Sequence, residues 1–445
     1  MPARSVRRRR DLYTSSVDDV EKVRSALLGV LDMVEDASPV AAVEAATRRV
    51  GEALGASSVS FLVADLSGRS LVRLTQFELS GESAESLPGL NEDRDRHTQD
   101  LATVVPLDGG SAHEALKQQT VQVLPPGATG PADLWTVLAP VTERGEALGL
   151  LVFCLPTEPQ APILAEIART AHLLGFVVIA SRRHTDFYEW GQRDRPFSLS
   201  AEIQRRLLPP AYTCAASSLT LSGWIEPADH IGGDTFDYSL ARDALHLSMT
   251  DAMGHGIDSA LTATLCVGSL RNSRRLGMSL SEQAAKANEA LVSQQARAST
   301  ESFATGLLGR LELSTGVLTV VNAGHVAPYL VRGGMVRALE FPVDMPFGLF
   351  EQSTYHGTEI PLERGDRLVF VTDGMLERNA ADLDLPSMLL ATRESHPREA
   401  TRELADKVLE ATGHALADDA TLLILDWYDS SAPVRHTVSG TPRVA

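Results

Sequence analysis

Hydrophobic positions in the first half of the chain alternate between helical and strand-like spacing. Over residues 17–56 apolar residues recur every three or four positions, which predicts two amphipathic helices. The stretch SSVSFLVADLSGRSLVRLTQFEL predicts two strands that turn at Ser67 and Gly68, and DLWTVLAPVTERGEALGLLVFCL predicts a second pair that turns at ERGE. A polar stretch over residues 80–100 predicts a long loop, and a helix is expected over residues 162–188.

From residue 211 onward the pattern is richer in strands. ALHLSMTD alternates apolar and polar residues, as a half-buried strand does. TGLLGRLELSTGVLTVVNAG and PYLVRGGMVRAL predict hairpins, the second turning on Gly333 and Gly334. DRLVFVTDG and ATLLILDWY predict short buried strands, and helices are expected over residues 257–276, 279–296 and 397–412.

These patterns predict two α+β domains in a chain of 445 residues, which is too long for one ordinary core. Between them, SAEIQRRLLPP predicts a short amphipathic helix that Pro209 and Pro210 end, because proline lacks the backbone donor. The predicted organisation is a basic tail over 1–16, a first domain over 17–185, a helical linker over 186–210, a second domain over 211–428 and a tail over 429–445.

Composition and charge exclude several classes of function. The net charge of −18 argues against nucleic-acid binding, and we take the basic cluster Arg7–Arg10 as a solvated tail in preference to a nucleic-acid or membrane contact. The three cysteines are far apart, which fits a reducing compartment and no metal–thiolate site. No apolar run approaches the roughly 20 residues that cross a bilayer. We therefore expect a cytoplasmic protein without membrane or nucleic-acid partners.

Acidic residues stand where several predicted strands begin or end. Asp234 follows Gly232 and Gly233 in IGGDTFD, with Asp237 three residues later. The other strand-end positions are Asp251 in SMTDAMGHG, Asp373 in VFVTDG, and the pair Asp418 and Asp419 in DDATLLIL. Glycine flanks three of these four places, counting Asp234 as the first. Each residue alone is an ordinary cap or turn former, so the signal lies in the set.

Carboxylates that converge at one sheet edge need a counter-charge. Two of them about 4 Å apart repel by roughly 4 kcal/mol at an effective dielectric constant near 20. They would either take up protons or bind hard, oxygen-ligated cations, and Mg²⁺ or Mn²⁺ suits a site without thiolates. The flanking glycines allow the backbone to approach such ions closely.

The ordered set GGDTFDY, TDAMGHGIDSAL, FATGLLGRLEL, NAGHVAPYL, PFGL, GDRLVFVTDGMLE and DDATLLIL spans nearly all of residues 211–428. It resembles the metal-dependent PPM-type serine/threonine protein phosphatases, specifically the bacterial branch that includes sporulation stage II protein E. The resemblance implies a β-sandwich with helices on both outer faces and two divalent ions, Mn²⁺ or Mg²⁺, at one end. It also implies that water hydrolyses phosphoserine or phosphothreonine on a protein.

Position by position, the resemblance assigns the site as follows. Asp251 would bridge both ions, the Ala252 carbonyl would supplement one of them, and Asp234 would hold an ion largely through water. Asp373 and one of the pair Asp418 and Asp419, with Asp418 favoured, would ligate the other ion. The residues expected to shape the loops are Gly232, Gly233, Gly254 and Gly256.

The sequence departs from the better-known eukaryotic branch in one respect that concerns the proton donor. That branch has a histidine two residues after the bridging aspartate, where this chain has Met253, and a histidine follows only at His255. Both His255 and water are candidates for protonating the leaving serine oxygen. His325 in NAGH matches the family pattern, and we expect it to be structural, with hydrogen bonds inside a hairpin.

Residues 17–185 resemble a GAF-type sensor domain in the order of their elements, although a plain dimerisation module is the alternative. The resemblance of the second domain implies that SAEIQRRLLPP acts as a switch helix. It also implies a phosphorylated regulatory protein, an anti-sigma-factor antagonist, as substrate. We further expect a homodimer through helices near residues 17–36 and 162–188.

Two other functions stay open. The first is a catalytically silent regulator that binds phosphoprotein, for which the expected mark is a missing ligand carboxylate; all of them are present. The second is a two-metal phosphoesterase that acts on small molecules, for which the sequence offers neither a P-loop nor a cluster of aromatic residues.

Overall fold

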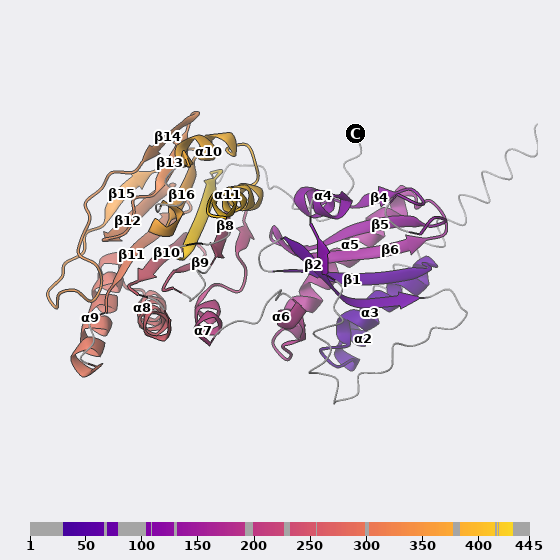
Figure 1. Cartoon of the computed structure of the whole chain (residues 1–445), viewed down its shortest axis with the longest axis horizontal. Helices are drawn as coiled ribbons and strands as arrows, with labels where there is room; N and C mark the ends of the chain where they lie inside the picture. The colour runs from indigo at the N-terminus through magenta and orange to yellow at the C-terminus, as the bar shows by residue number, and fades with distance from the viewer. Residues whose placement is uncertain are drawn as a thin grey trace, which may run out of the picture. The chain divides into compact units, whose positions relative to one another are not determined.

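The computed structural model places the strands in three antiparallel sheets, one in a first unit and two in a second (Figure 1). It describes residues 30–65, 69–78, 104–107, 109–128, 131–191, 199–226, 232–254, 256–298, 302–376, 383–413, 416 and 418–429. The predicted basic tail, the predicted loop over residues 80–100 and nearly all of the predicted C-terminal tail lie outside these residues. The boundary between the first and the second unit lies between residues 191 and 199.

The first unit contains one six-stranded sheet with the order β3-β2-β1-β6-β5-β4. Its strands are β1 (Ser58–Ala64), β2 (Ser70–Glu78), β3 (Val104–Pro106), β4 (Gln122–Leu124), β5 (Trp135–Glu143) and β6 (Glu146–Leu155). Its helices are α2 (Val30–Asp36), α3 (Ala42–Leu54), α4 (Ser111–Gln118), α5 (Ala161–Ser181) and α6 (Phe187–Gly191).

Turn chemistry explains the hairpin between β5 and β6. Arg144 and Gly145 both have positive φ, at 44° and 85°, as a two-residue turn of type I′ requires. This is the ERGE turn predicted from the sequence, and the hairpin is confirmed. The pair of strands predicted around Ser67 and Gly68 is also present, as β1 and β2.

Alternation along β1 directs side chains to both faces of the sheet. Phe61 and Val63 lie in a core with residues of α3 and α5, whereas Leu62 lies in a smaller core with Leu116 of α4. The sheet is therefore covered by helices on both faces. The resemblance of this unit to GAF-type sensors stays a prediction.

Helix α5 corrects two expectations from the sequence. The helix predicted over residues 162–188 ends at Ser181, and a separate short helix follows at Phe187. By length and composition alone α5 would also suffice to cross a membrane, although half of its most apolar window is buried in the unit. Gly175 explains the close packing, since an added Cβ would lie 3.0 Å from the carbonyl oxygen of Thr142 in β5.

The second unit begins with α7 (Leu199–Leu207) and is a sandwich of two sheets. The five-stranded sheet has the order β15-β12-β11-β10-β9 and the six-stranded sheet the order β14-β13-β16-β17-β8-β7. The strands are β7 (Thr213–Ala215), β8 (Leu219–Glu226), β9 (Thr235–Leu240), β10 (Ala244–Ala252), β11 (Ala304–Glu312), β12 (Val317–Ala323), β13 (Tyr329–Arg332), β14 (Met335–Ala338), β15 (Thr358–Pro361), β16 (Arg367–Val371) and β17 (Ala420–Trp427). The remaining helices are α8 (Ile257–Arg275), α9 (Leu280–Ala298), α10 (Leu385–Ala391), α11 (Pro397–Ala411) and the 3₁₀ turn η3 (Asp373–Met375).

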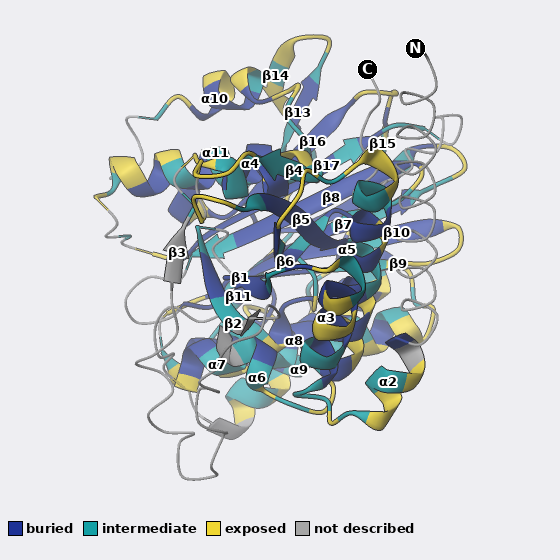
Figure 2. Cartoon of the chain, turned by 90° about the vertical axis from the view of Figure 1, so that its right-hand side faces the viewer, coloured by how far each residue is buried: buried dark blue, intermediate teal, exposed yellow. Residues whose placement is uncertain are grey.

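Three hydrophobic clusters hold this sandwich together. The cluster between the sheets includes Leu247 of β10 and Leu423 of β17. A second lies under α8 and α9, and a third under α10 and α11, so helices cover both outer faces. Figure 2 shows the strands largely buried and the helices exposed along their outer sides. The predicted β-sandwich with flanking helices is confirmed.

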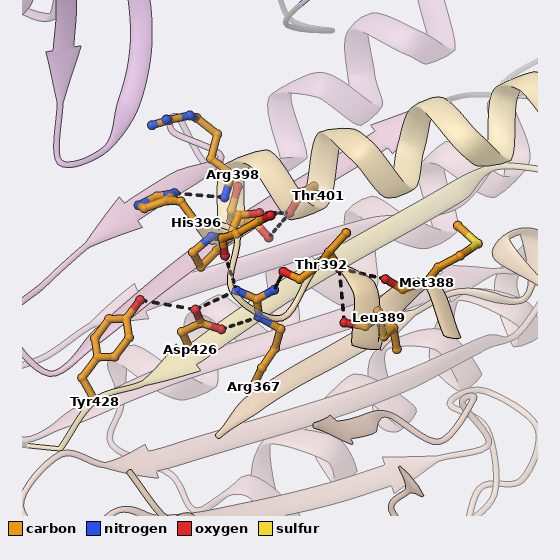
Figure 3. A network of polar contacts seen from close by, with 12 residues as sticks. Arg367, Met388, Leu389, Thr392, His396, Arg398, Thr401, Asp426 and Tyr428 are labelled. Carbon is orange, nitrogen blue, oxygen red and sulfur yellow. Dashed lines mark hydrogen bonds and ion pairs between the residues drawn. The ribbon is translucent and has the colours of Figure 1, made fainter. Parts of the chain in front are cut away.

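A buried arginine ties β16 and β17 to the turn that joins α10 to α11 (Figure 3). Arg367 is 3 % exposed and pairs with both carboxylate oxygens of Asp426, at 2.6 and 2.9 Å. The same guanidinium donates to the carbonyl oxygens of Thr392 and Ser395, each at 2.6 Å. Because β16 runs into Asp373 and β17 starts after Asp419, this network holds the two strands that carry those residues.

Replacing Arg367 with methionine should lower the free energy of unfolding of this unit by about 3–5 kcal/mol, because Asp426 and two carbonyls lose their partner. Hydrogen–deuterium exchange of peptides from β16 and β17 measures the change. The control is Arg393→Ala, whose partly exposed side chain pairs with Glu394 and whose loss should cost within about 0.5 kcal/mol. Equal exchange in the two variants would contradict the stabilising role of Arg367.

Candidate metal centre

The carboxylates predicted from the sequence lie at strand ends that meet at one edge of the sandwich. Asp234 directly precedes β9 and Asp251 lies near the end of β10, both in the five-stranded sheet. Asp373 opens the 3₁₀ turn after β16, and Asp418 lies two residues before β17, both belonging to the six-stranded sheet. The two sheets thus contribute two carboxylates each.

Asp234 connects the two sheets. It is 2 % exposed, and its Oδ2 accepts hydrogen bonds from the hydroxyls of Thr372 and Thr421, each at 2.6 Å. Thr372 follows β16 and Thr421 is the second residue of β17. The carboxylate of a residue from one sheet is therefore held by two side chains of the other.

The carboxylates at this edge of the sandwich repel one another. The pKa of Asp234 is raised well above its ordinary value, first by burial and then by the nearby carboxylates of Asp251 and Asp419, while the two threonine hydroxyls act in the opposite direction. The pKa of Asp373 is raised by partial burial and by Asp418. Oxygen ligands that raise one another's pKa fit a divalent cation, which would reverse the effect.

The carboxylates come together in the structure as neighbours, Asp234 with Asp251 and Asp419, and Asp373 with Asp418. Among the described residues, no group of three or more aspartate, glutamate, histidine or cysteine side chains is close enough to hold a metal ion. The ligand assignments implied by the resemblance accordingly stay predictions.

Asp418 and Asp419 lie in different surroundings. Asp419 is buried, and its carboxylate accepts hydrogen bonds from the Gly232 N–H and the Gln204 side chain, each at 3.0 Å. Asp418 is exposed, and its Oδ1 accepts the N–H of Asp419 at 2.8 Å. The choice of Asp418 as the direct ligand stays a prediction.

Glycines let backbone segments approach this centre. An added Cβ on Gly232 would lie 2.3 Å from the Asp419 carboxylate, and one on Gly233 would lie 2.3 Å from the Ala252 carbonyl oxygen. One on Gly374 would lie 2.0 Å from the Asp419 carbonyl oxygen. Because real Cβ atoms do not come so near, Gly233 and Gly374 must be glycine beside these backbone atoms, and a side chain at position 232 would displace the Asp419 carboxylate.

The loop after β10 also depends on glycine. Gly254 and Gly256 have φ of 93° and 81°, which side-chain-bearing residues rarely adopt. Met253 is exposed between Ala252 and this turn. His255 lies outside the described residues, so its part in protonating the leaving group stays a prediction.

His325 has the contacts of the structural role predicted for it. Its N–H donates to the Asn322 side chain at 2.7 Å, and that side chain donates back to its carbonyl at 2.9 Å. Its Nδ1 lies 2.8 Å from the hydroxyl of Thr305, which pairs with Asp251 across β10 and β11. Burial lowers the pKa of His325 to about 4, so the ring is neutral near pH 7.

The family model for stage II sporulation protein E (SpoIIE) matches residues 241–428. This part of the chain is a SpoIIE-type PPM phosphatase domain. The matched range includes Asp251, Asp373, Asp418 and Asp419, whereas Asp234 lies just before it.

Individual relatives cover about half of the chain. The phosphoserine phosphatase RsbU of Bacillus subtilis is 23% identical over 234 residues, which are 51% of this chain and 68% of that protein. A solved structure of the RsbU and RsbW domains of a Mycobacterium tuberculosis protein is 25% identical with a TM-score of 0.42, and the match covers 49% of this chain and 61% of that one. The SiaA-PP2C domain of Pseudomonas aeruginosa is 21% identical with a TM-score of 0.41, covering 46% of this chain and 85% of that one.

Sequence reasoning missed three side chains of the second unit that touch the candidate ligands. These are Thr372 and Thr421, which hold Asp234, and Gln204, which contacts Asp419. Both threonines stand within two residues of a predicted ligand, so a search for hydroxyl donors beside the strand-end carboxylates would have found them. The chain itself gives no comparable signal for Gln204, which lies 215 positions from its partner.

Replacing Gly374 with alanine should destabilise the SpoIIE-type domain by about 1–3 kcal/mol or more, because the new methyl group would collide with immobile backbone of Asp419. Thermal unfolding without metal measures the effect. The control is Gly268→Ala in α8, where an added Cβ meets nothing within 4 Å and alanine should stabilise the helix by about 0.5–1 kcal/mol. A Gly374 variant as stable as the wild type would contradict the close approach.

Proposed function

We propose that the chain is a metal-dependent serine/threonine protein phosphatase. One observation supports this above the others: strand ends from both sheets bring Asp234, Asp251, Asp373 and Asp418 to one edge, where burial and mutual repulsion raise the pKa of Asp234 and Asp373. Such a group of carboxylates in a SpoIIE-type domain suits the binding of two divalent ions.

The proposed roles follow the resemblance described above. Asp251 and the Ala252 carbonyl would help to hold the ions, together with Asp373 and Asp418, and Asp234 would contribute through water. When bound, Mn²⁺ or Mg²⁺ stabilises charge on the phosphoryl oxygens and makes a hydroxide available near neutral pH.

The chain's residues would then orient the attacking water in line with the bond that breaks. A bond forms between the water oxygen and phosphorus, and the bond between phosphorus and the serine oxygen breaks. The leaving oxygen takes a proton from His255 or from solvent water. The hydroxyls of Thr372 and Thr421 would keep the buried Asp234 carboxylate in place for this attack.

The proposed substrate is a phosphorylated regulatory protein, an anti-sigma-factor antagonist. The support is the likeness to RsbU of Bacillus subtilis, a phosphoserine phosphatase, and to a Mycobacterium tuberculosis protein that has both RsbU and RsbW domains. A small-molecule phosphoester is the competing substrate class. A catalytically silent regulator is the other alternative.

Phosphate release from a phosphoserine protein should depend on Mn²⁺ and should exceed release from nucleotides. Asp251→Ala and Asp373→Ala should each lower the rate by about 100-fold or more while the domain stays folded, because each removes a charge that holds an ion. The control is Asp243→Ala, an exposed residue that pairs with Arg310 and should leave the rate unchanged. Release without Mn²⁺, or from nucleotides only, would overturn the proposed activity, and no release at all would favour the silent regulator.

We also propose that α7 transmits a signal from the first unit to the metal centre. Gln204 on this helix donates from Nε2 to the carbonyl oxygen of Asp234 at 2.8 Å and to the carboxylate of Asp419 at 3.0 Å. The side chain is 4 % exposed, so both bonds are shielded from water. A small rotation of α7 would break them.

The end of α7 is anchored as well. Arg271 of α8 donates to the Leu207 carbonyl oxygen at 2.5 Å and pairs with Asp237 of β9 at 2.8 and 3.1 Å. Arg274 adds a second contact to Asp237 at 3.0 Å. Since Asp237 lies three residues after Asp234, the helix is connected to the strand that carries a proposed ligand. Signals that move α7 would therefore reposition Asp234 and, through β10, the loop from Asp251 to Gly256.

In the full chain, Gln204→Ala should weaken Mn²⁺ binding by about 10–100-fold, the usual cost of removing a hydrogen-bond partner of a metal-site residue. Isothermal titration calorimetry measures the affinity. Glu202→Gln is the control, because Glu202 lies on the same helix and pairs with Arg206. If a segment of residues 198–428 has the same activity and metal affinity as the whole chain under every condition, the regulatory role is wrong.

A further inference from the structure

Thr372 and Thr421 form a pair of hydroxyl donors around a single carboxylate oxygen. Thr372 and Thr421 are both fully buried, and both hydroxyls donate to Oδ2 of Asp234 at 2.6 Å. Hydrogen bonds from hydroxyls to a charged acceptor at this distance are of the strong kind. Two such bonds on the same atom define both the position and the rotation of the carboxylate plane.

The two threonines are themselves locked to each other. The Thr372 N–H donates to the Thr421 carbonyl oxygen at 3.1 Å, and the Thr421 N–H donates to the Thr372 hydroxyl oxygen at 2.9 Å. Thr372 Oγ1 thus accepts from the backbone of β17 while its proton points to Asp234. Because β-branched side chains have few χ1 rotamers, the two hydroxyls have little freedom to turn away.

We propose that Thr372 and Thr421 are positioning residues that hold Asp234 in the orientation needed to bind a divalent cation. This inference rests on the proposed metal centre. The two bonds engage Oδ2 and thereby direct Oδ1 as the oxygen for the ion or its water. They also act on Asp234 against the repulsion from Asp251 and Asp419.

A merely structural threonine has a different pattern of contacts. Thr401 in α11 is also buried, at 3 % exposed, but its hydroxyl donates to the carbonyl oxygen of Pro397 at 2.7 Å, one turn back on the same helix, and lies 3.5 Å from the Ser222 carbonyl oxygen. Such a bond satisfies the hydroxyl and positions no charged group. Thr401→Val therefore provides a matched control for loss of a buried hydroxyl.

The test is calorimetric titration of the metal-free full chain with MnCl₂, for the wild type, Thr372→Val, Thr421→Val, Thr401→Val and the two serine variants Thr372→Ser and Thr421→Ser. Valine keeps the shape of threonine and removes the donor, whereas serine keeps the donor. Each threonine-to-valine change at 372 or 421 should weaken Mn²⁺ binding by about 10–100-fold. Both serine variants and Thr401→Val should bind Mn²⁺ as the wild type does.

A second measurement separates positioning from general damage. The Mn²⁺ concentration that gives half-maximal phosphate release should rise for Thr372→Val and Thr421→Val, and saturating Mn²⁺ should restore most of the rate. If valine variants bind Mn²⁺ with wild-type affinity, or serine variants are as weak as valine variants, the inference is overturned.

Failure to fold and failure of the proposed activity can each be distinguished from failure of the positioning role. If a valine variant does not fold, the corresponding cysteine variant, a poor donor of similar size, replaces it and should bind Mn²⁺ more weakly than the serine variant. A wild-type chain that binds Mn²⁺ without releasing phosphate would overturn the proposed activity and leave the threonine comparison valid. A wild-type chain that binds no Mn²⁺ would overturn both.

Discussion

The carboxyl group of Asp234 is buried at the edge where two sheets meet, and burial alone would favour its neutral form. The carboxylates of Asp251 and Asp419 also raise its pKa, and among the described residues the hydroxyls of Thr372 and Thr421 oppose them. A protein gains nothing in stability by collecting acidic groups in this way. The arrangement makes physical sense when a cation supplies the missing positive charge.

The sandwich is the scaffold that makes this possible. Each sheet has its own hydrophobic cover of helices, and the apolar cluster between the sheets fixes how they face each other. Polar contacts, such as those of Asp234 with Thr372 and Thr421, then hold the two sheets together at the edge where the acidic residues lie. Gly232, Gly233 and Gly374 leave room for backbone and carboxylate atoms to come closer than any side-chain carbon would allow.

The contacts of α7 give the second unit a physical connection between its first helix and the candidate metal centre. The Gln204 side chain donates hydrogen bonds to the carbonyl oxygen of Asp234 and to the carboxylate of Asp419. Arg271 connects the Leu207 carbonyl oxygen to Asp237. Besides these polar bonds, Leu207 of α7 and the following Leu208 lie in two hydrophobic clusters of the second unit.

Local pattern was sufficient for much of the fold. The strand over ALHLSMTD, the turn at Arg144 and Gly145, and the helices depend on neighbours along the chain, so the sequence determined them by itself. The expectation that this strand is half-buried was wrong, because helices cover its second face and leave Ser248 and Thr250 only 7 % and 1 % exposed. It also placed the acidic residues at strand ends, and the resemblance of the ordered motifs indicated the phosphatase fold. The single helix expected over residues 162–188 was wrong, since α5 ends at Ser181 and α6 begins at Phe187. Periodicity along the chain does not show where a helix stops packing on a sheet.

Only the tertiary structure decided which groups meet. The Thr372 and Thr421 hydroxyls lie 138 and 187 positions from Asp234, and the Gln204 side chain lies 215 positions from Asp419. The same holds for the different surroundings of Asp418 and Asp419, which are adjacent in sequence and indistinguishable in type. Periodicity reports which face of an element is apolar, whereas the partner of a buried polar atom depends on how distant strands pair and how two sheets stack, and these are properties of the folded chain alone.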